Sequence, residues 1–342
     1  MKKEKPLIIS DPFPRTMELI FTKSQIKYLN TKFKLINAPN KNKSNFYDNY
    51  LSQAKYIIGQ PDLPTEIINK QTKLKAIFNV ESNFMDNMDY DYCFKNNIHV
   101  LSTAPVFAQS VAEIAVGLTI SLKRDIHKAH LDFFQKKEKY GLESNLRSSL
   151  LLDNKIGFIG FGDLAKSLKP MLMPYTSNFK VYDPWLPNKL IEANGCKSAS
   201  LKEIFKDCDV VYVLATITTK NKSMIDKKLL KLMKKDTCLL ILSRASVINF
   251  QDLNEILNKD KIKVATDVFP QEPVPKNDPI REKKNILFSA HRAGALESVF
   301  FEMGDIVCED LLLMTKGLPP RLCRRAELET VKNLRSKPVD IN

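Results

Sequence analysis

The chain has 342 residues, of which 44% are hydrophobic, and this length predicts two domains of ordinary size. No run of about eighteen apolar residues occurs, and the first apolar stretch is interrupted at Asp11 and Pro12, so we expect a soluble cytoplasmic protein without membrane span or signal peptide. The net charge of +14 comes from scattered lysines rather than one basic helix, which argues against a nucleic-acid partner but would attract an anionic substrate or cofactor.

The chain before residue 103 alternates short apolar runs with helical stretches. Because parallel strands need a crossover between them, this alternation predicts βα units around a parallel sheet. The expected strands are residues 7–9, 33–36, 56–58, 74–80 and 98–101.

Apolar residues then recur at helical spacing from Ser110 to about His130, which predicts one long helix that could link two domains. A polar stretch, residues 135–149, precedes a second series of strands. These strands, with helices between them, fit a doubly wound dinucleotide-binding sheet. They are residues 156–159, 180–182, 210–214, 238–242, 263–266 and 286–288.

A helical pattern resumes after Gly294 and continues to Lys316. Its natural place is against the first domain, which would then be discontinuous. We therefore expect an α/β protein with a smaller, flavodoxin-like domain (residues 1–103 and 300–342) and a Rossmann-type dinucleotide-binding domain (residues 104–299).

The first turn of the second sheet has the pattern of a dinucleotide site. Gly160 allows a sharp exit from the strand, Gly162 lets the backbone approach a pyrophosphate, and Ala165 lets helix and strand pack closely. Asp183 follows about twenty residues on, at a strand end, where it can bind ribose hydroxyls and repel a 2′-phosphate. The pattern favours NAD over NADP, although a purely structural βα turn is the alternative.

The six cysteines form no CxxC pair and have no metal-ligand spacing with the four histidines. Reduced, packed thiols and no metal site are therefore expected. The positions are Cys93, Cys196, Cys208, Cys238, Cys308 and Cys323.

Three charged residues stand just beyond strand ends of the second sheet, where open α/β sheets bind ligands. Arg244 can grip a carboxylate in two-pronged fashion, and His291 can exchange a proton near neutral pH. A carboxylate such as Glu272 would fix the histidine tautomer and favour its protonated form. Each residue alone could be a surface, turn or packing residue, but the three together indicate an active site.

Five further segments show a resemblance to the D-isomer-specific 2-hydroxyacid dehydrogenases, in collinear order over nearly the whole chain. The five segments are residues 74–80, 111–118, 229–244, 267–275 and 290–295, and the glycine turn of residues 155–165 shares the resemblance.

The resemblance assigns roles to single positions. It makes His291 the acid/base, Glu272 its partner, and Arg244 the ligand of the substrate carboxylate and carbonyl. It places Asp267 near the nicotinamide carboxamide and Asp183 on the adenosine ribose. The remaining cofactor contacts would be Gly160, Gly162, Asp163, Leu164, Ser243 and His291, and the substrate loop would include Val80, Glu81 and Ser82. It also implies a cleft that closes on cofactor and substrate, and a homodimer formed through the cofactor domain.

Several positions depart from the family pattern. Ala245 replaces a glycine, Ala290 replaces a proline, and Thr216 replaces a common proline. The substrate loop, residues 79–84, lacks the usual glycines, and the carboxylate of Glu81 would repel an anionic substrate unless it points away or binds a hydroxyl. Phe84 and Phe107 could line the substrate pocket or belong to the core.

The sequence thus predicts an NAD-dependent oxidoreductase that moves a hydride between nicotinamide and C2 of a small 2-oxo or 2-hydroxy acid, with D-stereochemistry implied by the resemblance. Two alternatives stay open. One is a non-catalytic NAD-sensing protein on the same scaffold, and the other is a dehydrogenase of the formate or phosphite type.

Overall fold

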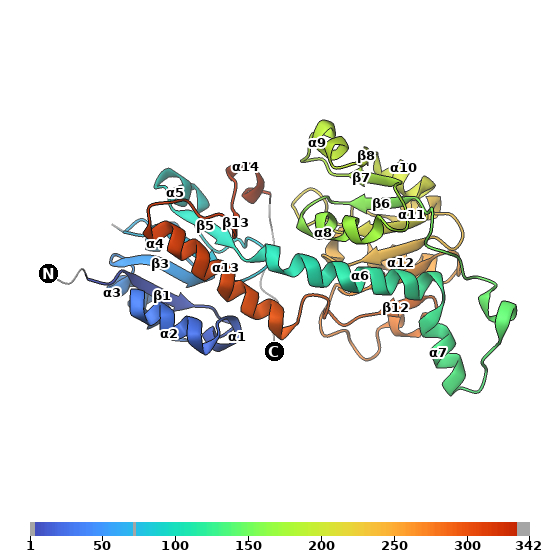
Figure 1. Cartoon of the computed structure of the whole chain (residues 1–342), viewed down its shortest axis with the longest axis horizontal. Helices are drawn as coiled ribbons and strands as arrows, with labels where there is room; N and C mark the ends of the chain where they lie inside the picture. The colour runs from blue at the N-terminus through green and yellow to red at the C-terminus, as the bar shows by residue number, and fades with distance from the viewer. Residues whose placement is uncertain (1–3, 71–72, 334–342) are drawn as a thin grey trace. The chain divides into compact units, whose positions relative to one another are not determined.

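The computed structural model describes residues 4–70 and 73–333. Contacts divide the chain into two compact units, and Figure 1 labels the helices and strands of both. Unit 1 contains the described residues up to Phe107 and those from Ala295 onward, and unit 2 is Ala108–Gly294. Each unit has its own mainly parallel sheet with helices, so the predicted α/β class is confirmed.

The sheet of unit 1 has the order β13-β5-β4-β3-β1-β2. The short strand β13 is antiparallel to β5 and was not predicted, whereas the other neighbours are parallel. The bounds are β1 (Leu7–Asp11), β2 (Lys34–Asn37), β3 (Ala54–Gly59), β4 (Ala76–Asn79), β5 (His99–Ser102) and β13 (Arg324–Arg325).

Helices cover both faces of this sheet. One buried cluster joins strand residues such as Ile58 to apolar residues of α1 (Met17–Ile20), α2 (Lys23–Lys32) and α13 (Glu297–Thr315). A second cluster, on the other face, includes residues of α3 (Lys43–Tyr50), α4 (Thr65–Ile68), α5 (Tyr90–Lys95) and α14 (Leu328–Val331). A short 3-10 helix, η1 (Ala104–Val106), follows β5.

The sheet of unit 2 is parallel throughout, in the order β12-β11-β10-β9-β6-β7-β8. It contains the predicted strands and one more, β8. Strands β6, β9, β10 and β11 are buried along their whole length, as expected of strands covered on both faces. The bounds are β6 (Ile156–Ile159), β7 (Phe179–Tyr182), β8 (Lys197–Ser198), β9 (Val210–Val213), β10 (Cys238–Ile241), β11 (Lys263–Thr266) and β12 (Ile286–Phe288).

Two helical layers enclose this sheet. Apolar residues of α6 (Phe107–Lys123), α8 (Asp163–Leu172) and α9 (Asn188–Ala193) belong to one buried cluster. Those of α10 (Leu201–Asp207), α11 (Lys227–Leu232) and α12 (Phe250–Leu257) belong to another. Short 3-10 helices, η2 (Gly141–Asn145), η3 (Ala245–Val247) and η4 (Pro279–Glu282), lie in the connections.

The expectation of one helix from Ser110 to His130 was wrong, because α6 ends at Lys123 and α7 spans Ile126–Phe134. Asp125, between them, has a φ of 50°, in the left-handed region that interrupts a helix. The segment Ala104–Lys123 is long and apolar enough to span a membrane by length and composition. Its apolar residues include Val111, Ala115 and Leu122 of a buried core cluster, which accounts for this composition by packing within unit 2.

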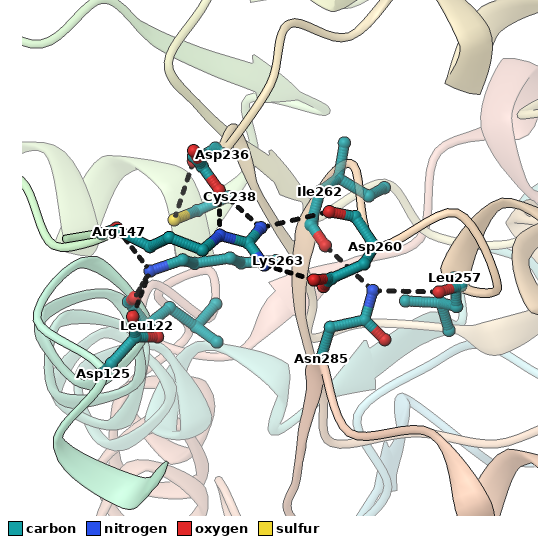
Figure 2. Close-up of polar contacts among 10 residues, drawn as sticks. All are labelled: Leu122, Asp125, Arg147, Asp236, Cys238, Leu257, Asp260, Ile262, Lys263 and Asn285. Carbon is teal, nitrogen blue, oxygen red and sulfur yellow. Dashed lines mark hydrogen bonds and ion pairs between the residues drawn. The ribbon is translucent and has the colours of Figure 1, made fainter. Parts of the chain in front are cut away.

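A buried lysine fastens the break between α6 and α7 to the amino end of β11 (Figure 2). The Lys263 ammonium donates to the carbonyls of Leu122 (3.0 Å) and Arg147 (2.9 Å) and pairs with the Asp125 carboxylate (2.8 Å). The Arg147 guanidinium in turn pairs with Asp236 and Asp260. These contacts hold both ends of residues 124–147 against the sheet.

Candidate active site

Strand register places the candidate residues of unit 2 at one edge of its sheet. Ile159 is paired with Tyr182 and Val213, so the carboxyl ends of β6, β7 and β9 are level. The pairings of Ile241 with Thr266, and of Thr266 with Phe288, bring the ends of β10, β11 and β12 to the same edge. In open α/β sheets, this edge binds ligands where the strand order reverses, here between β6 and β9.

The glycine turn connects β6 to α8. Gly160 has a φ of +90°, and an added Cβ would lie 2.6 Å from Ala215 Cα, so a side chain is excluded there. Gly162 is the N-cap of α8, and no side chain caps the helix there, in contrast to α10, which has a capping box. Asp163 and Leu164 form its first turn. Backbone amides at the positive end of a ten-residue helix fit the pyrophosphate of a dinucleotide.

Asp183 follows the end of β7 and is tied to the glycine turn. Its Oδ2 accepts a hydrogen bond from the Phe161 amide (2.8 Å), and its Oδ1 accepts one from the Trp185 amide (2.9 Å). Each carboxylate oxygen can accept a further bond. Asp183 therefore holds the backbone of the glycine turn at Phe161, and its carboxylate oxygens can still accept hydrogen bonds from ribose hydroxyls.

Arg244 and Ser243 follow the end of β10. The Ser243 hydroxyl is buried and donates to the Ala215 carbonyl (2.7 Å), which joins the loops after β9 and β10. The half-buried Arg244 donates through Nη1 to the Ser243 carbonyl (2.8 Å). Ala245 lies in η3, which requires no positive φ, so alanine is accommodated where the family has glycine.

Glu272 and His291 form the hydrogen bond expected of an acid/base pair. His291 Nδ1 and Glu272 Oε2 are 2.5 Å apart, and Glu272 Oε1 accepts from the Phe269 amide (2.8 Å). Burial disfavours the charged form of Glu272, but these bonds and the positive charges of His291 and Arg244 outweigh it and lower the pKa of the carboxyl. The pair leaves Nε2 of the imidazole as the atom that can exchange a proton with a substrate.

Asp267 organises the segment that carries His291. Its buried carboxylate accepts from the amides of Arg292 (3.0 Å) and Ala293 (3.2 Å), and its carbonyl accepts from the His291 amide (2.7 Å). The three bonds give Asp267 a structural function that the sequence did not reveal.

The predicted substrate loop lies in unit 1, after β4. Val80 is fully buried, and the Ser82 hydroxyl accepts from the Asn83 amide group (3.3 Å). The Glu81 carboxylate is paired with Arg15, with Nε to Oε1 at 3.1 Å and Nη2 to Oε2 at 3.2 Å. The Glu81 side chain therefore neither faces solvent nor binds a hydroxyl, because it forms an ion pair with Arg15.

Phe84 belongs to a buried core cluster, and Phe107 packs against another.

The structure brings the candidates together as two sets. Arg244, Glu272, His291 and Asp267 share the sheet edge of unit 2 with the glycine turn, while Val80, Glu81 and Ser82 lie in unit 1. The other histidines lie in β5 (His99) and α7 (His127 and His130). Sequence reasoning missed Arg15, because 66 positions separate it from Glu81.

The six cysteines are buried and unpaired, as predicted, and burial raises the pKa of Cys93, Cys208, Cys238 and Cys308 to about 12. Within residues 4–70 and 73–333, no cluster of three or more histidine, cysteine, aspartate or glutamate side chains could hold a metal ion.

Comparison with known proteins finds similar sequences and structures. The sequence model described as "D-isomer specific 2-hydroxyacid dehydrogenase, NAD binding domain" matches residues 116–293. The crystal structure of a phosphoglycerate oxidoreductase from Rhizobium etli is similar over 95% of this chain and 100% of its own, with 40% identity and a TM-score of 0.86.

Two curated relatives match at lower identity. A D-3-phosphoglycerate dehydrogenase from Methanocaldococcus jannaschii is 27% identical over 74% of this chain, and the match spans only 48% of that relative. A glyoxylate reductase from Aeropyrum pernix is 21% identical over 95% of this chain and 97% of its own length. The matches extend over both units of the present chain.

Proposed function

The chain belongs to the D-isomer specific 2-hydroxyacid dehydrogenase family and carries its NAD-binding domain, and from this premise we propose that it transfers a hydride between NAD and C2 of a small 2-oxo or D-2-hydroxy acid. The observation that carries the proposal is the Glu272–His291 hydrogen bond at the carboxyl edge of the sheet. Arg244 follows the neighbouring strand end. An NAD-sensing protein would not need this proton-transfer pair.

The chemistry divides between cofactor and protein. The nicotinamide supplies or accepts the hydride when it is bound. In the direction of reduction, His291 donates the proton from Nε2 to the carbonyl oxygen, while Glu272 stabilises the protonated imidazole through Nδ1. Arg244 binds the substrate carboxylate and polarises the adjacent carbonyl, which stabilises the negative charge that develops on its oxygen.

The cofactor contacts support NAD. The amides at the N-terminus of α8, those of the N-cap Gly162 and of Asp163 and Leu164, would hold the pyrophosphate, and Asp183 would accept from the adenosine ribose. A carboxylate at this position would repel a 2′-phosphate. Ser243, Asp267 and His291 would border the nicotinamide.

The proposed substrate class rests on Arg244, and the family resemblance adds Val80, Glu81 and Ser82 of the unit 1 loop as substrate contacts. An arginine that can bind a carboxylate in two-pronged fashion favours 2-oxo acids over one-carbon anions. The names of the relatives include glyoxylate reductase and phosphoglycerate dehydrogenase, so glyoxylate and phosphorylated 2-oxo acids are the first compounds to test.

The assembly that fits these features is a cytoplasmic homodimer formed through unit 2, with no membrane or nucleic-acid partner. α7 and the segment after it project from the layers of unit 2 (Figure 1), and their apolar side chains are exposed. Phe134, Tyr140 and Leu142 are each more than 70% exposed, at 74%, 76% and 80%. An exposed patch of this kind suits a second copy of the chain.

The test is a screen of 2-oxo acids with NADH, in which turnover is measured as the loss of NADH absorbance. We expect turnover with at least one 2-oxo acid and none when NAD is combined with formate or phosphite. His291→Ala should lower kcat by roughly a hundredfold or more with NADH binding retained. His130→Ala, which removes an exposed histidine of α7, is the control.

NADH binding without any turnover would instead support a sensor. Turnover of formate or phosphite would support the other alternative.

A further inference from the structure

We propose that Arg15 is a specificity-determining residue, which neutralises Glu81 and thereby allows the loop of residues 80–84 to accept an anionic substrate. The inference rests on the proposed function, because the role of this loop in substrate binding comes from it. Arg15 itself is assigned to no contact with the substrate and acts on it only through the charge of Glu81.

The guanidinium of Arg15 holds the loop at three points. It forms the two-pronged pair with the Glu81 carboxylate, and its Nε also donates to the Val80 carbonyl (2.9 Å). The side chains of Arg15 and Glu81 are only 17% and 21% exposed, so solvent screens the pair less than it would a surface pair. The guanidinium carbon also lies 4.8 Å from the centroid of the Phe300 ring of α13, within cation–π range.

Other hydrogen bonds fix the backbone of the loop. The Glu81 amide donates to Asn79 Oδ1 (2.9 Å), and the Glu81 carbonyl accepts from the Ser102 hydroxyl (2.8 Å). Asn79 also donates to the Asn83 carbonyl (3.0 Å). Because the backbone has these separate supports, the loop does not depend on Arg15 alone for its shape, and the distinct contribution of Arg15 is the positive charge beside Glu81.

The charge matters because the substrate is an anion. An unpaired carboxylate in the loop would repel the substrate carboxylate equally in the bound ground state and in the transition state, which raises KM and leaves kcat nearly unchanged. A purely mechanical clamp has a different signature, since removing either partner would loosen the loop in the same direction. The signs of the changes in single and double variants therefore separate the two.

The experiment compares Arg15→Met, Glu81→Gln and the double variant with the unmodified protein. We expect Arg15→Met to raise KM for the best 2-oxo acid by roughly tenfold or more, with kcat within about twofold. Glu81→Gln should leave KM unchanged or lower it, and the double variant should return KM to within about threefold of the original. Raised salt should reduce the effect of Arg15→Met.

The matched control is Lys70→Met, which removes the same charge from unit 1 at an exposed ion pair with Asp48. It should leave KM unchanged. A KM that Arg15→Met does not move, or that rises equally in Arg15→Met and Glu81→Gln, would overturn the proposal. Failure of the unmodified protein to turn over any 2-oxo acid would instead overturn the proposed function.

Hydrogen exchange gives a readout that needs no activity. If Arg15 mainly supplies charge, the amides of residues 80–84 should exchange at nearly the same rate in Arg15→Met as in the unmodified protein, because Asn79 and Ser102 still hold the backbone. Exchange of this loop that accelerates by roughly tenfold or more would mean that Arg15 acts as a mechanical support, contrary to the proposal.

Discussion

Replacing Glu272 by glutamine would remove the charge next to His291 and keep an acceptor of the same shape. Burial would raise the pKa of Glu272, but its hydrogen bonds and the nearby positive charges of His291 and Arg244 lower it, so this carboxyl stays ionised throughout the neutral range. The ionised carboxylate holds His291 Nδ1 by a charge-assisted hydrogen bond, which glutamine cannot form. Glu272→Gln should therefore lower kcat for reduction of a 2-oxo acid.

The size of this decrease in kcat follows from the exposure of the pair. Hydrogen bonds to charged groups contribute about 1.5–3 kcal/mol. The His291 and Glu272 side chains are 40% and 20% exposed, so solvent screening brings the expected value to the lower end of that range. About 1.4 kcal/mol corresponds to a factor of ten in rate, and we expect kcat to fall by about tenfold.

The assay is kcat for reduction of the best 2-oxo acid at saturating NADH and one fixed pH. Glu255→Gln is the control, because this exposed carboxylate of α12 pairs with Lys227 away from the site. A kcat of Glu272→Gln within about twofold of that of the unmodified protein would show that the Glu272 charge does not act on His291.

Three further variants test other parts of the site and fold. Arg244→Lys should raise KM for a 2-oxo acid and lower kcat, with ΔΔG‡ of about 2–4 kcal/mol and NADH affinity unchanged, because lysine cannot bind carboxylate and carbonyl together; unchanged constants would contradict the role. Asp183→Asn should narrow the preference for NADH over NADPH by about tenfold in fluorescence titrations, and equal affinities in the unmodified protein would refute the assignment. Lys263→Met should lower the free energy of unfolding of unit 2 by about 3 kcal/mol, because it leaves the Asp125 carboxylate without the positive charge of Lys263. The fluorescence of Trp185, the one tryptophan, follows unfolding in urea. A decrease in the free energy of unfolding of less than about 1 kcal/mol would refute this prediction.

Most of the cofactor-binding half could be predicted because its strands are apolar along their whole length. Short, wholly apolar runs such as Val210–Val213 and Cys238–Ile241 are typical of central strands in a parallel sheet that is covered on both faces. Once these strands are parallel, the residues just after them must share one edge. The proximity of Arg244, Glu272 and His291 was therefore accessible from the sequence.

The elements that the sequence missed carry no apolar pattern. Strands β8 (Lys197–Ser198) and β13 (Arg324–Arg325) are two-residue, exposed edge strands that form through backbone pairing. The helix break at Asp125 involves neither glycine nor proline and is held by Lys263, far along the chain. Contacts of this kind depend on tertiary structure, which local propensity does not encode.

The departure at Ala290 shows how the remaining fold can compensate for a lost local constraint. A proline before the histidine would restrict the backbone, and His291 has a φ of 49°, which an L-residue adopts only when its surroundings hold it there. Asp267 provides that hold with a carbonyl bond to the His291 amide and carboxylate bonds to the next two amides. Asp267 thus holds the backbone of His291, while the Phe269 amide holds the Glu272 carboxylate. With alanine at position 290, His291 Nδ1 and Glu272 Oε2 therefore still lie within hydrogen-bond distance.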